Sequence, residues 1–338
     1  MKFILPVSIL VSFLIAVYMT PWSIRYLRRI GLIVKDQNKY GKPLIPISGG
    51  MAVLAGFFIG MMVYLFLQTF LPDGYALNNR MLMLLLSALI SIIMITFVGF
   101  IDDLIIKQDK EVSIGLRQWQ KPFLTLTAAI PLVVVNAGVT TVIIPFLDRV
   151  NIGLVYPLIL IPLGVVGAAN MVNLLAGFNG LETGMGLVYV GMLTLYAYVN
   201  REGLFLVERT SVVVIGSIVF AALLGFYLFN RYPAKILPGD SLTYLLGGTL
   251  AGIAIIGNLE KAAIIASIPF FIEFILKLRG RLDKKTYGYC YKGKIKSYYN
   301  KIYSLPHILT KTGRFTEKEI VYIFILIELF FSSLIWIL

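Results

Sequence analysis

Residues 170–184 read NMVNLLAGFNGLETG and interrupt a chain that is otherwise apolar enough to lie in lipid. Three asparagines and three glycines fall in this segment, between two long apolar stretches. Backbone that glycine exposes cannot face hydrocarbon without hydrogen-bond partners. Asparagine side chains offer oxygen ligands to a metal ion, and both donors and acceptors to the edge of a base. The segment is therefore either an ordinary connecting loop, for which Asn and Gly are usual residues, or part of a polar site.

The composition is that of an integral membrane protein. The 338 residues are 59% hydrophobic and 14% charged, and the mean hydropathy is +0.87, which is too apolar for an ordinary soluble domain. Apolar runs of about 17 to 25 residues cross a bilayer as helices. We read ten such runs, centred near Leu10, Phe58, Ile90, Leu132, Leu160, Gly191, Ile218, Thr249, Ile268 and Phe330. The sequence therefore predicts one all-α polytopic membrane domain over residues 1–338, with its first span retained and a short external β-hairpin at residues 140–152.

The distribution of Lys and Arg predicts the orientation, because these residues accumulate in cytoplasmic loops. Ten spans place five loops on one side, around residues 24–45, 102–121, 172–183, 230–242 and 277–318, and these loops hold 24 of the 30 basic residues. We therefore expect both termini outside, in the plasma membrane or the endoplasmic reticulum. The long basic loop 277–318 interleaves Lys with Tyr. Beside a membrane this pattern favours acidic lipid headgroups, so we expect no nucleic-acid partner.

Two adjacent carboxylates, Asp102 and Asp103, close the third span on the predicted cytoplasmic side. Adjacent acids repel each other unless a cation neutralises them, and such a pair suits divalent-metal binding or proton abstraction. The alternative is a solvated helix end. We favour function, because the helix dipole opposes an acid at a helix C-terminus. Lys121 follows at a helix start that could reach a phosphate, although by itself it is better explained as a basic anchor at the interface.

Two further polar residues stand out on the same side. Asp240 follows Gly239, which permits a tight turn, and one carboxylate with an asparagine oxygen would make a sparse Mg²⁺ site. Asp240 also suits the N-cap of the eighth span, and the two roles can coexist. His307 is the only histidine and follows Pro306 in a basic loop. It could donate to a phosphate oxygen, but a lone histidine is more often structural.

The first cytoplasmic loop carries Asp36, Asn38 and Lys39, and paired glycines follow at Gly49 and Gly50. This is either a basic loop before a helix start, or a place where the glycines allow a ligand or another helix to come close. All of the unusual polar clusters thus fall on loops of the predicted cytoplasmic face. Their shared location makes them one candidate site.

Together these residues resemble the polyprenyl-phosphate N-acetylhexosamine-1-phosphate transferases over nearly the whole chain. An Asp pair after the third span, an Asn-rich loop after the fifth, Gly-Asp after the seventh and a histidine-bearing loop after the ninth occur in that order. The stretch NLLAGFNGLE at residues 173–182 looks like the eukaryotic and archaeal branch, which makes N-acetylglucosaminyl-diphospho-dolichol, and so does DQNK at residues 36–39. The bacterial phospho-N-acetylmuramoyl-pentapeptide transferases carry an Asp-Gly-x-Asp-Gly form instead.

The resemblance implies transfer of N-acetylglucosamine 1-phosphate from UDP-N-acetylglucosamine to a dolichyl or other polyprenyl phosphate in the bilayer, with release of UMP. This is the first step of lipid-linked oligosaccharide synthesis for glycosylation. It also implies a requirement for Mg²⁺, with Mn²⁺ as a substitute, and leaves a homodimer open. By position it assigns Mg²⁺ to Asn173 and Asp240; catalysis on the phosphates to Asp102, Asp103, Lys121 and His307; uracil to Gly177 and Asn179; and further substrate contacts to Asn38, Lys39 and Glu182.

Two rival functions stay open at this point. A sibling transferase would use another UDP-sugar or a bacterial undecaprenyl carrier, and residues around His307 would distinguish it. An ion-coupled transporter would use the same acids as a cation pathway. It predicts charges within facing spans, but the clearest such charge, Glu273, lies near the cytoplasmic end of the ninth span. No internal repeat of the kind common in secondary transporters stands out, which weakens the transporter hypothesis.

Overall fold

The computed structural model describes residues 3–71, 78–105, 115–117, 119–138, 141–144, 148–200 and 205–337. Its helices are α1 (Ile4–Arg29), α2 (Gly50–Phe70), α3 (Asn79–Leu104), α4 (Gln120–Thr127), α5 (Ile130–Val134), η1 (Tyr156–Leu160), α6 (Ile161–Leu174), α7 (Leu181–Val199), α8 (Leu206–Asn230), α9 (Gly239–Gly257), α10 (Glu260–Ala266), α11 (Ile268–Arg279), α12 (His307–Thr310), α13 (Glu317–Ser333) and η3 (Leu334–Ile337). Its strands form antiparallel pairs, β1 (Ile33–Lys35) with β2 (Leu44–Pro46), β3 (Thr141–Ile144) with β4 (Asp148–Asn151), and β5 (Tyr289–Tyr291) with β6 (Lys294–Lys296). The helical fold class is the one that the composition predicts.

Seven helical segments in the described chain are long and apolar enough to cross a membrane: α1, α2, α3, η1 with α6, α8, α9, and α13 with η3. The protein is thus a polytopic integral membrane protein. The other three expected spans coincide with α4 and α5, with α7, and with α10 and α11. Pro131 and Pro269 lie in the first turns of α5 and α11, where proline ends the preceding helix and leaves two short pieces. The number of ten spans remains a prediction.

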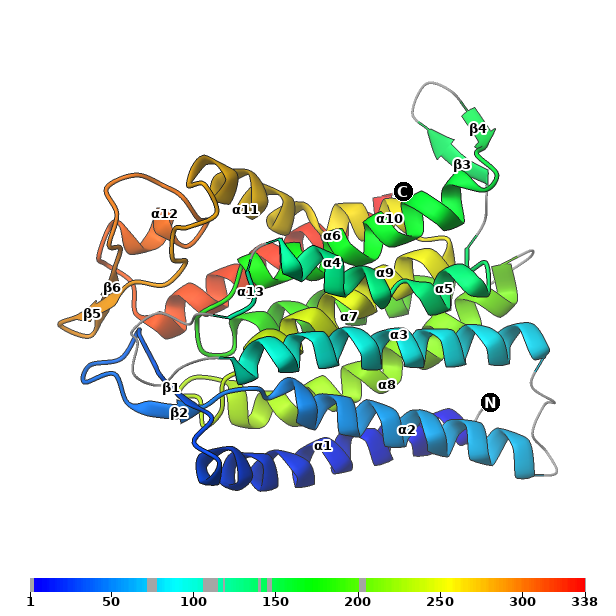
Figure 1. Cartoon of the computed structure of the whole chain (residues 1–338), viewed down its shortest axis with the longest axis horizontal. Helices are drawn as coiled ribbons and strands as arrows, with labels where there is room; N and C mark the ends of the chain where they lie inside the picture. Colours follow the sequence, from blue (N-terminus) through cyan, green and yellow to red (C-terminus); the bar gives the residue numbers. More distant parts are fainter. Residues whose placement is uncertain are drawn as a thin grey trace.

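The long helices run side by side, and the smaller elements gather at the two ends of the bundle (Figure 1). The pairs β1–β2 and β5–β6 lie at one end with α12, and β3–β4 projects from the other end. The β3–β4 pair is the hairpin expected at residues 140–152, with Thr141 opposite Asn151. Between α11 and α13, residues 280–316 form a segment that falls within the expected loop 277–318.

Helix α9 is the centre of the bundle, and its residues Ser241–Gly257 are all buried. Glycines on two neighbouring helices let their backbones approach its first turn. A Cβ atom on Gly99 of α3 would lie 2.3 Å from the backbone oxygen of Asp240, and one on Gly50 of α2 would lie 2.3 Å from the backbone nitrogen of Leu242. Backbone atoms cannot move aside, so only glycine fits. These contacts fix the start of α9 between α2 and α3.

Two buried charges on α11 fasten the segment that follows it. The Glu273 carboxylate accepts hydrogen bonds from Ser304 Oγ and from the backbone N–H of Leu305, both at 2.6 Å. Lys277 Nζ lies 3.8 Å from Glu273 and donates to the backbone oxygen of Lys284 at 2.6 Å. Glu273 therefore has partners for its charge within the fold. Glu273 thus gives the transporter hypothesis no support.

Candidate active site

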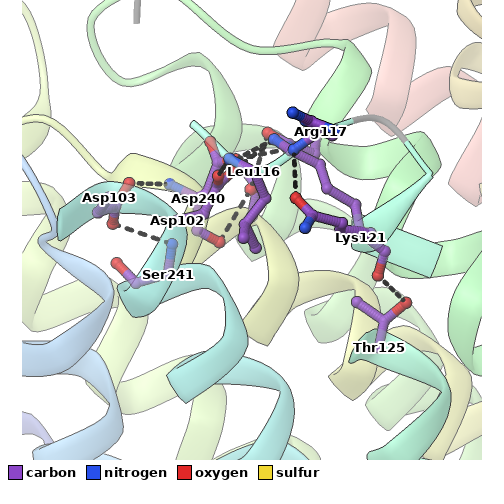
Figure 2. Close-up of polar contacts among 11 residues, drawn as sticks. Asp102, Asp103, Leu116, Arg117, Lys121, Thr125, Asp240 and Ser241 are labelled. Carbon is purple, nitrogen blue, oxygen red and sulfur yellow. Dashed lines mark hydrogen bonds and ion pairs between the residues drawn. The ribbon is translucent and has the colours of Figure 1, made fainter. Parts of the chain in front are cut away.

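The residues Asp102, Lys121, Asn173 and Asp240 form what we call the acid–lysine cluster. It lies where α3 ends, α4 begins, α6 ends and α9 begins, and Figure 2 shows most of its polar contacts. The sequence places these four residues in three separate loops. The fold thus brings four of the expected site residues together at one end of the bundle.

Lys121 is the centre of the acid–lysine cluster. Its Nζ atom lies 2.5 Å from Asp102 Oδ2 and 2.8 Å from Asp240 Oδ2 (Figure 2). The other oxygen of Asp102 accepts a hydrogen bond from the backbone N–H of Leu116. One ammonium group thus neutralises two carboxylates, as closely spaced acids require. The side chains of Lys121 and Asp240 are 22% and 27% exposed, so the cluster is accessible from the solvent.

Asn173 completes the cluster from the last turn of α6. Its Nδ2 donates to Asp240 Oδ2 at 3.0 Å, and its Oδ1 accepts a hydrogen bond from Thr243 Oγ1 at 3.1 Å. A threonine hydroxyl can donate or accept, so turning the amide would keep the Thr243 contact and bring Oδ1 beside Asp240. Asn173 and Asp240 can therefore present two oxygens to one point.

These oxygens fit a sparse Mg²⁺ site. No group of three or more His, Cys, Asp or Glu side chains in the described part of the chain is arranged to hold a metal ion. Mg²⁺ usually takes one or two protein carboxylates and completes its shell with water and substrate phosphates. One carboxylate and one amide oxygen, open to solvent and beside a lysine, match that chemistry in type and number.

Asp103 points away from Lys121 and caps α9. Its Oδ1 accepts a hydrogen bond from the backbone N–H of Asp240 at 2.7 Å, and its Oδ2 accepts from that of Ser241 at 3.2 Å (Figure 2). The expectation that Asp240 itself caps this helix was wrong, because the N-cap residue is Pro238 and no side chain of the helix makes the cap. An acid from α3 satisfies the free amides instead, and its charge suits the positive end of the α9 dipole.

The turn between α6 and α7 carries the Asn-rich motif. Gly177 and Gly180 adopt φ angles of +121° and +86°, which L side chains rarely adopt. A Cβ on Gly177 would also lie 3.2 Å from the Tyr287 ring. The backbone N–H of Gly177 donates to Glu182 Oε1 at 2.7 Å, so this acid folds back on its own turn. The glycines and the glutamate of this motif are thus explained by the tight turn that they form, whether or not a ligand binds there.

Asn179 has protein partners for both ends of its side chain. Its Nδ2 donates to Asp36 Oδ2 at 3.1 Å, and its Oδ1 accepts a hydrogen bond from the backbone N–H of Ala234 at 2.9 Å. The residue is 2% exposed. Its contact with uracil stays a prediction, and any such contact would use the remaining donor and acceptor positions of an amide that is already oriented.

Asn38 and Lys39 of the first loop also contact the protein. Asn38 donates to the backbone oxygen of Gly177 at 2.7 Å and accepts a hydrogen bond from Gly288 N–H at 3.2 Å. Lys39 Nζ forms an ion pair with Glu317. We call the set Asp36, Asn38, Lys39, Asn179 and Glu317 the loop hub. It joins the first loop, the Asn-rich turn and the start of α13, and substrate contacts of Asn38, Lys39 and Glu182 stay predictions.

His307 lies in the segment between α11 and α13 and not in the acid–lysine cluster. It is fully buried, its Nδ1 accepts a hydrogen bond from Tyr303 N–H at 3.2 Å, and its Nε2 donates to the Lys285 backbone oxygen at 2.9 Å. Burial lowers the pKa of His307 below its usual value. In this structure the residue supports the segment, and its action on sugar or phosphate stays a prediction.

Glu317 is the site residue that sequence reasoning missed. A signal exists in the letters TEKE at residues 316–319, because Thr316 and Glu319 form a capping box that starts α13. Such a box locates a helix start, and here the start faces the Asn-rich turn. Nothing in the letters tells which of the two glutamates is buried: Glu317 is 3% exposed, whereas Glu319 lies at the surface.

The fold and the cluster define a polytopic membrane protein with an acid–lysine site at its helix ends. The sequence profile of glycosyl transferase family 4 matches residues 85–258. A proposed UDP-N-acetylglucosamine–dolichyl-phosphate N-acetylglucosaminephosphotransferase of Saccharolobus solfataricus is 34% identical over 315 residues, which cover 93% of this chain and 90% of the relative. One of the same description from Sulfolobus acidocaldarius is 34% identical over 327 residues, 97% of this chain and 94% of the relative.

A bacterial relative is similar over less of the chain. The phospho-N-acetylmuramoyl-pentapeptide-transferase of Oceanobacillus iheyensis is 31% identical over 291 residues, which cover 83% of this chain and 84% of the relative. The protein belongs to glycosyl transferase family 4. The resemblance that the motifs indicated is thereby confirmed.

Proposed function

We propose that this protein transfers N-acetylglucosamine 1-phosphate from UDP-N-acetylglucosamine to dolichyl phosphate, or a similar polyprenyl phosphate, and releases UMP. An oxygen of the lipid phosphate attacks the phosphorus that carries the sugar. The bond from that phosphorus to the oxygen bridging the two phosphates of the nucleotide breaks, and UMP leaves with this oxygen. The product is N-acetylglucosamine joined to the lipid through a diphosphate.

One observation carries the proposal. The acid–lysine cluster assembles from three loops in a chain that aligns over 93% of its length with a relative whose name gives this activity. Two anionic substrates repel each other, and a site for them needs positive charge beside groups that can orient a phosphate. Lys121 between two carboxylates supplies both kinds of group. The polyprenyl chain of the acceptor lies in the bilayer, so a membrane-embedded protein suits this reaction.

The roles of the residues follow from their contacts. Lys121 balances the charge that develops on the departing UMP, because phosphoryl transfer depends mainly on positioning and electrostatic stabilisation. Asp102, which Lys121 and the Leu116 amide hold in place, orients the acceptor phosphate or takes its proton. Asp240 and Asn173 would hold Mg²⁺, which when bound would supply further neutralisation of the diphosphate. Asp103 sets the position of Asp240 through the backbone of α9.

The finer features of the arrangement belong to the same proposal. Ten spans, with both termini outside and the acid–lysine cluster on the cytoplasmic face, agree with the distribution of basic residues. The cytoplasm is also the compartment in which a soluble nucleotide sugar is available. The acceptor is dolichyl phosphate or, as in a sibling transferase, undecaprenyl phosphate.

Release of UMP tests the proposal. Membranes that carry the protein are incubated with UDP-N-acetylglucosamine, with and without polyprenyl phosphate and with and without Mg²⁺. We expect UMP only when all three are present, with membranes that lack the protein as the control. UMP release that does not depend on the lipid acceptor would contradict the proposed function. A panel of dolichyl and undecaprenyl phosphates then ranks the acceptors.

A further inference from the structure

Glu317, the first residue of the last long helix, touches the Asn-rich turn directly. Its Oε1 accepts a hydrogen bond from the backbone N–H of Asn179 at 2.8 Å, and its Oε2 pairs with Lys39 Nζ. Glu317 is 3% exposed, so both contacts form out of water, where charge-assisted hydrogen bonds are strong and their loss is costly.

The contact comes from a helix whose start is itself fixed. Thr316 Oγ1 accepts a hydrogen bond from Glu319 N–H at 3.3 Å, and Thr316 N–H donates to the Glu319 carboxylate at 2.7 Å. Farther along the helix, Ile325 packs so close to α7 that a Cβ on Gly184 would lie 2.4 Å from its Cδ1 atom. The helix therefore holds Glu317 in a fixed position beside the first turn of α7.

Lys39 extends the contact to the first loop. Its Nζ lies 3.9 Å from Asp36 Oδ2 and 3.7 Å from the centre of the Tyr232 ring. Asp36 in turn binds the Asn179 side chain. The same asparagine is thus held by its backbone through Glu317 and by its side chain through Asp36, and Lys39 neutralises both acids. Removing one member leaves a buried charge without its partner.

We propose that Glu317 is a positioning residue for nucleotide binding, which it serves by holding the turn at residues 177–180 through the Asn179 amide. This inference rests on the proposed function, because it takes that turn as part of the UDP-sugar site. The turn follows α6 directly and carries Gly177 and Asn179, while Asn173 lies one turn earlier. Glu317 contacts no residue of the acid–lysine cluster in the described chain, so its removal should weaken nucleotide binding more than turnover.

The test compares two substitutions at one position. Glu317→Ala removes both contacts, whereas Glu317→Gln keeps an acceptor for the Asn179 amide and loses only the charge that pairs with Lys39. The control is Glu319→Gln in the same helical turn, which removes a surface carboxylate, keeps an acceptor for the capping box and leaves the loop hub intact. Two measurements are made on each protein: hydrogen–deuterium exchange of peptides that cover residues 175–182, and steady-state kinetics with each substrate varied.

We expect Glu317→Ala to speed exchange in these peptides and to raise the KM for UDP-N-acetylglucosamine about 10- to 100-fold, the range that loss of a hydrogen bond to a charged group gives. The KM for the lipid acceptor should change less than about twofold in the same variant. Glu317→Gln should restore most of the protection and most of the KM. Glu319→Gln should match the wild type in both measurements.

Three results would overturn the inference. The first is unchanged exchange at residues 175–182 in Glu317→Ala, and the second is an equal rise of KM for both substrates. The third is equal damage by Glu317→Gln and Glu317→Ala. If Glu317→Ala does not fold, Glu317→Asp takes its place in the comparison with Glu317→Gln, because the shorter side chain keeps the charge and withdraws the acceptor from the Asn179 amide; it should speed exchange at residues 175–182. If the wild type releases no UMP, the proposed function fails, and the exchange measurement still decides whether Glu317 holds the turn.

Discussion

The acid–lysine cluster and the loop hub use the same chemistry for different ends. In each, one lysine pairs with two carboxylates: Lys121 with Asp102 and Asp240, and Lys39 with Asp36 and Glu317. In the cluster the side chains of Lys121 and Asp240 are 22% and 27% exposed and that of Asp102 is 3% exposed. In the hub Lys39 is 16% exposed and Asp36 and Glu317 are 3% and 2% exposed, so the main difference is the open carboxylate of Asp240. The polar atoms of the loop hub form hydrogen bonds and ion pairs with other protein groups. Those of the cluster remain within reach of a ligand.

This difference indicates that the polar residues of this membrane enzyme are of two kinds: some take part in the reaction, and others hold the loops in position. A buried network that is fully satisfied is rigid and specifies one arrangement of the loops. A partly open network keeps charges that a substrate or a metal ion can replace as partners. Substitutions in the two regions should therefore differ in kind, with effects on turnover in the cluster and on substrate binding or loop order in the hub.

The largest expected effect is at Asp240. Asp240→Ala removes the carboxylate that pairs with Lys121 and that we assign to Mg²⁺, so turnover should fall about 10³-fold or more. Asn173→Ala should also lower turnover. UMP release by purified protein measures the effect, and Asp283→Ala, whose carboxylate is 83% exposed, is the matched control. Wild-type activity in both Asp240→Ala and Asn173→Ala would show that the metal assignment is wrong.

Lys121 should come next, and it offers the sharpest contrast with the loop hub. Lys121→Met leaves Asp102 and Asp240 facing each other without a cation, and loss of one group that stabilises developing charge costs about 10²- to 10³-fold in kcat. Lys39→Met should instead act mainly on the KM for UDP-N-acetylglucosamine. Steady-state kinetics on the two variants side by side make the measurement. A pure KM effect in Lys121→Met would break the distinction between the two regions.

Asp103 should give an intermediate effect, because it acts on Asp240 through the backbone. Asp103→Ala leaves the amides of Asp240 and Ser241 without an acceptor, and a buried hydrogen-bond group left unsatisfied costs about 1–3 kcal/mol. We expect a lower midpoint of thermal unfolding together with a moderate loss of kcat. Asp103→Asn should recover part of both. A variant that loses activity while keeping full thermal stability would instead place Asp103 in direct contact with substrate.

His307 should give the smallest effect on stability at neutral pH, and the signature of its burial is a dependence of stability on pH. Burial lowers the pKa of His307 in the folded protein, so the unfolded chain binds the proton more readily. Its contribution to stability is present above the unfolded pKa of about 6.5 and is lost as the pH falls below that value, by up to about 1.4 kcal/mol per pH unit. The stability of His307→Gln should lack this part of the dependence on pH. Thermal unfolding of both proteins between pH 5 and 8 gives the difference, and identical slopes would contradict the assignment.

The acid–lysine cluster could be foreseen from the sequence, whereas the loop hub could not. Acids, amides and a lysine that interrupt apolar runs are visible without a structure, and the alternation of spans puts Asp102, Lys121, Asn173 and Asp240 on one face. Whether a polar side chain faces a ligand or another loop depends on contacts between distant residues. Asn179 and Glu317 belong to that second group, and so does the cap that Asp103 provides for α9.

The number of membrane spans, like the loop hub, could be predicted only in part from the sequence. Long apolar runs identify α1, α2, α3, α8, α9 and the last helix directly. The expected spans centred near Leu132 and Ile268 read as continuous by hydropathy, but each is divided into two short helices, with Pro131 and Pro269 in the first turn of the second helix. Local backbone chemistry overrides the apolar pattern at these places, and only the packing of neighbouring helices decides how the pieces lie.

Mass spectrometry of the lipid product tests the central claim most directly. Purified protein is given UDP-N-acetylglucosamine, a polyprenyl phosphate of known length and Mg²⁺, and the extracted lipid is analysed together with the nucleotide. We predict a lipid that carries one N-acetylhexosamine and two phosphates, with UMP as the nucleotide, both absent in Asp240→Ala. A lipid with the sugar on a single phosphate and UDP as the nucleotide would contradict the account, because the sugar alone would then have been transferred.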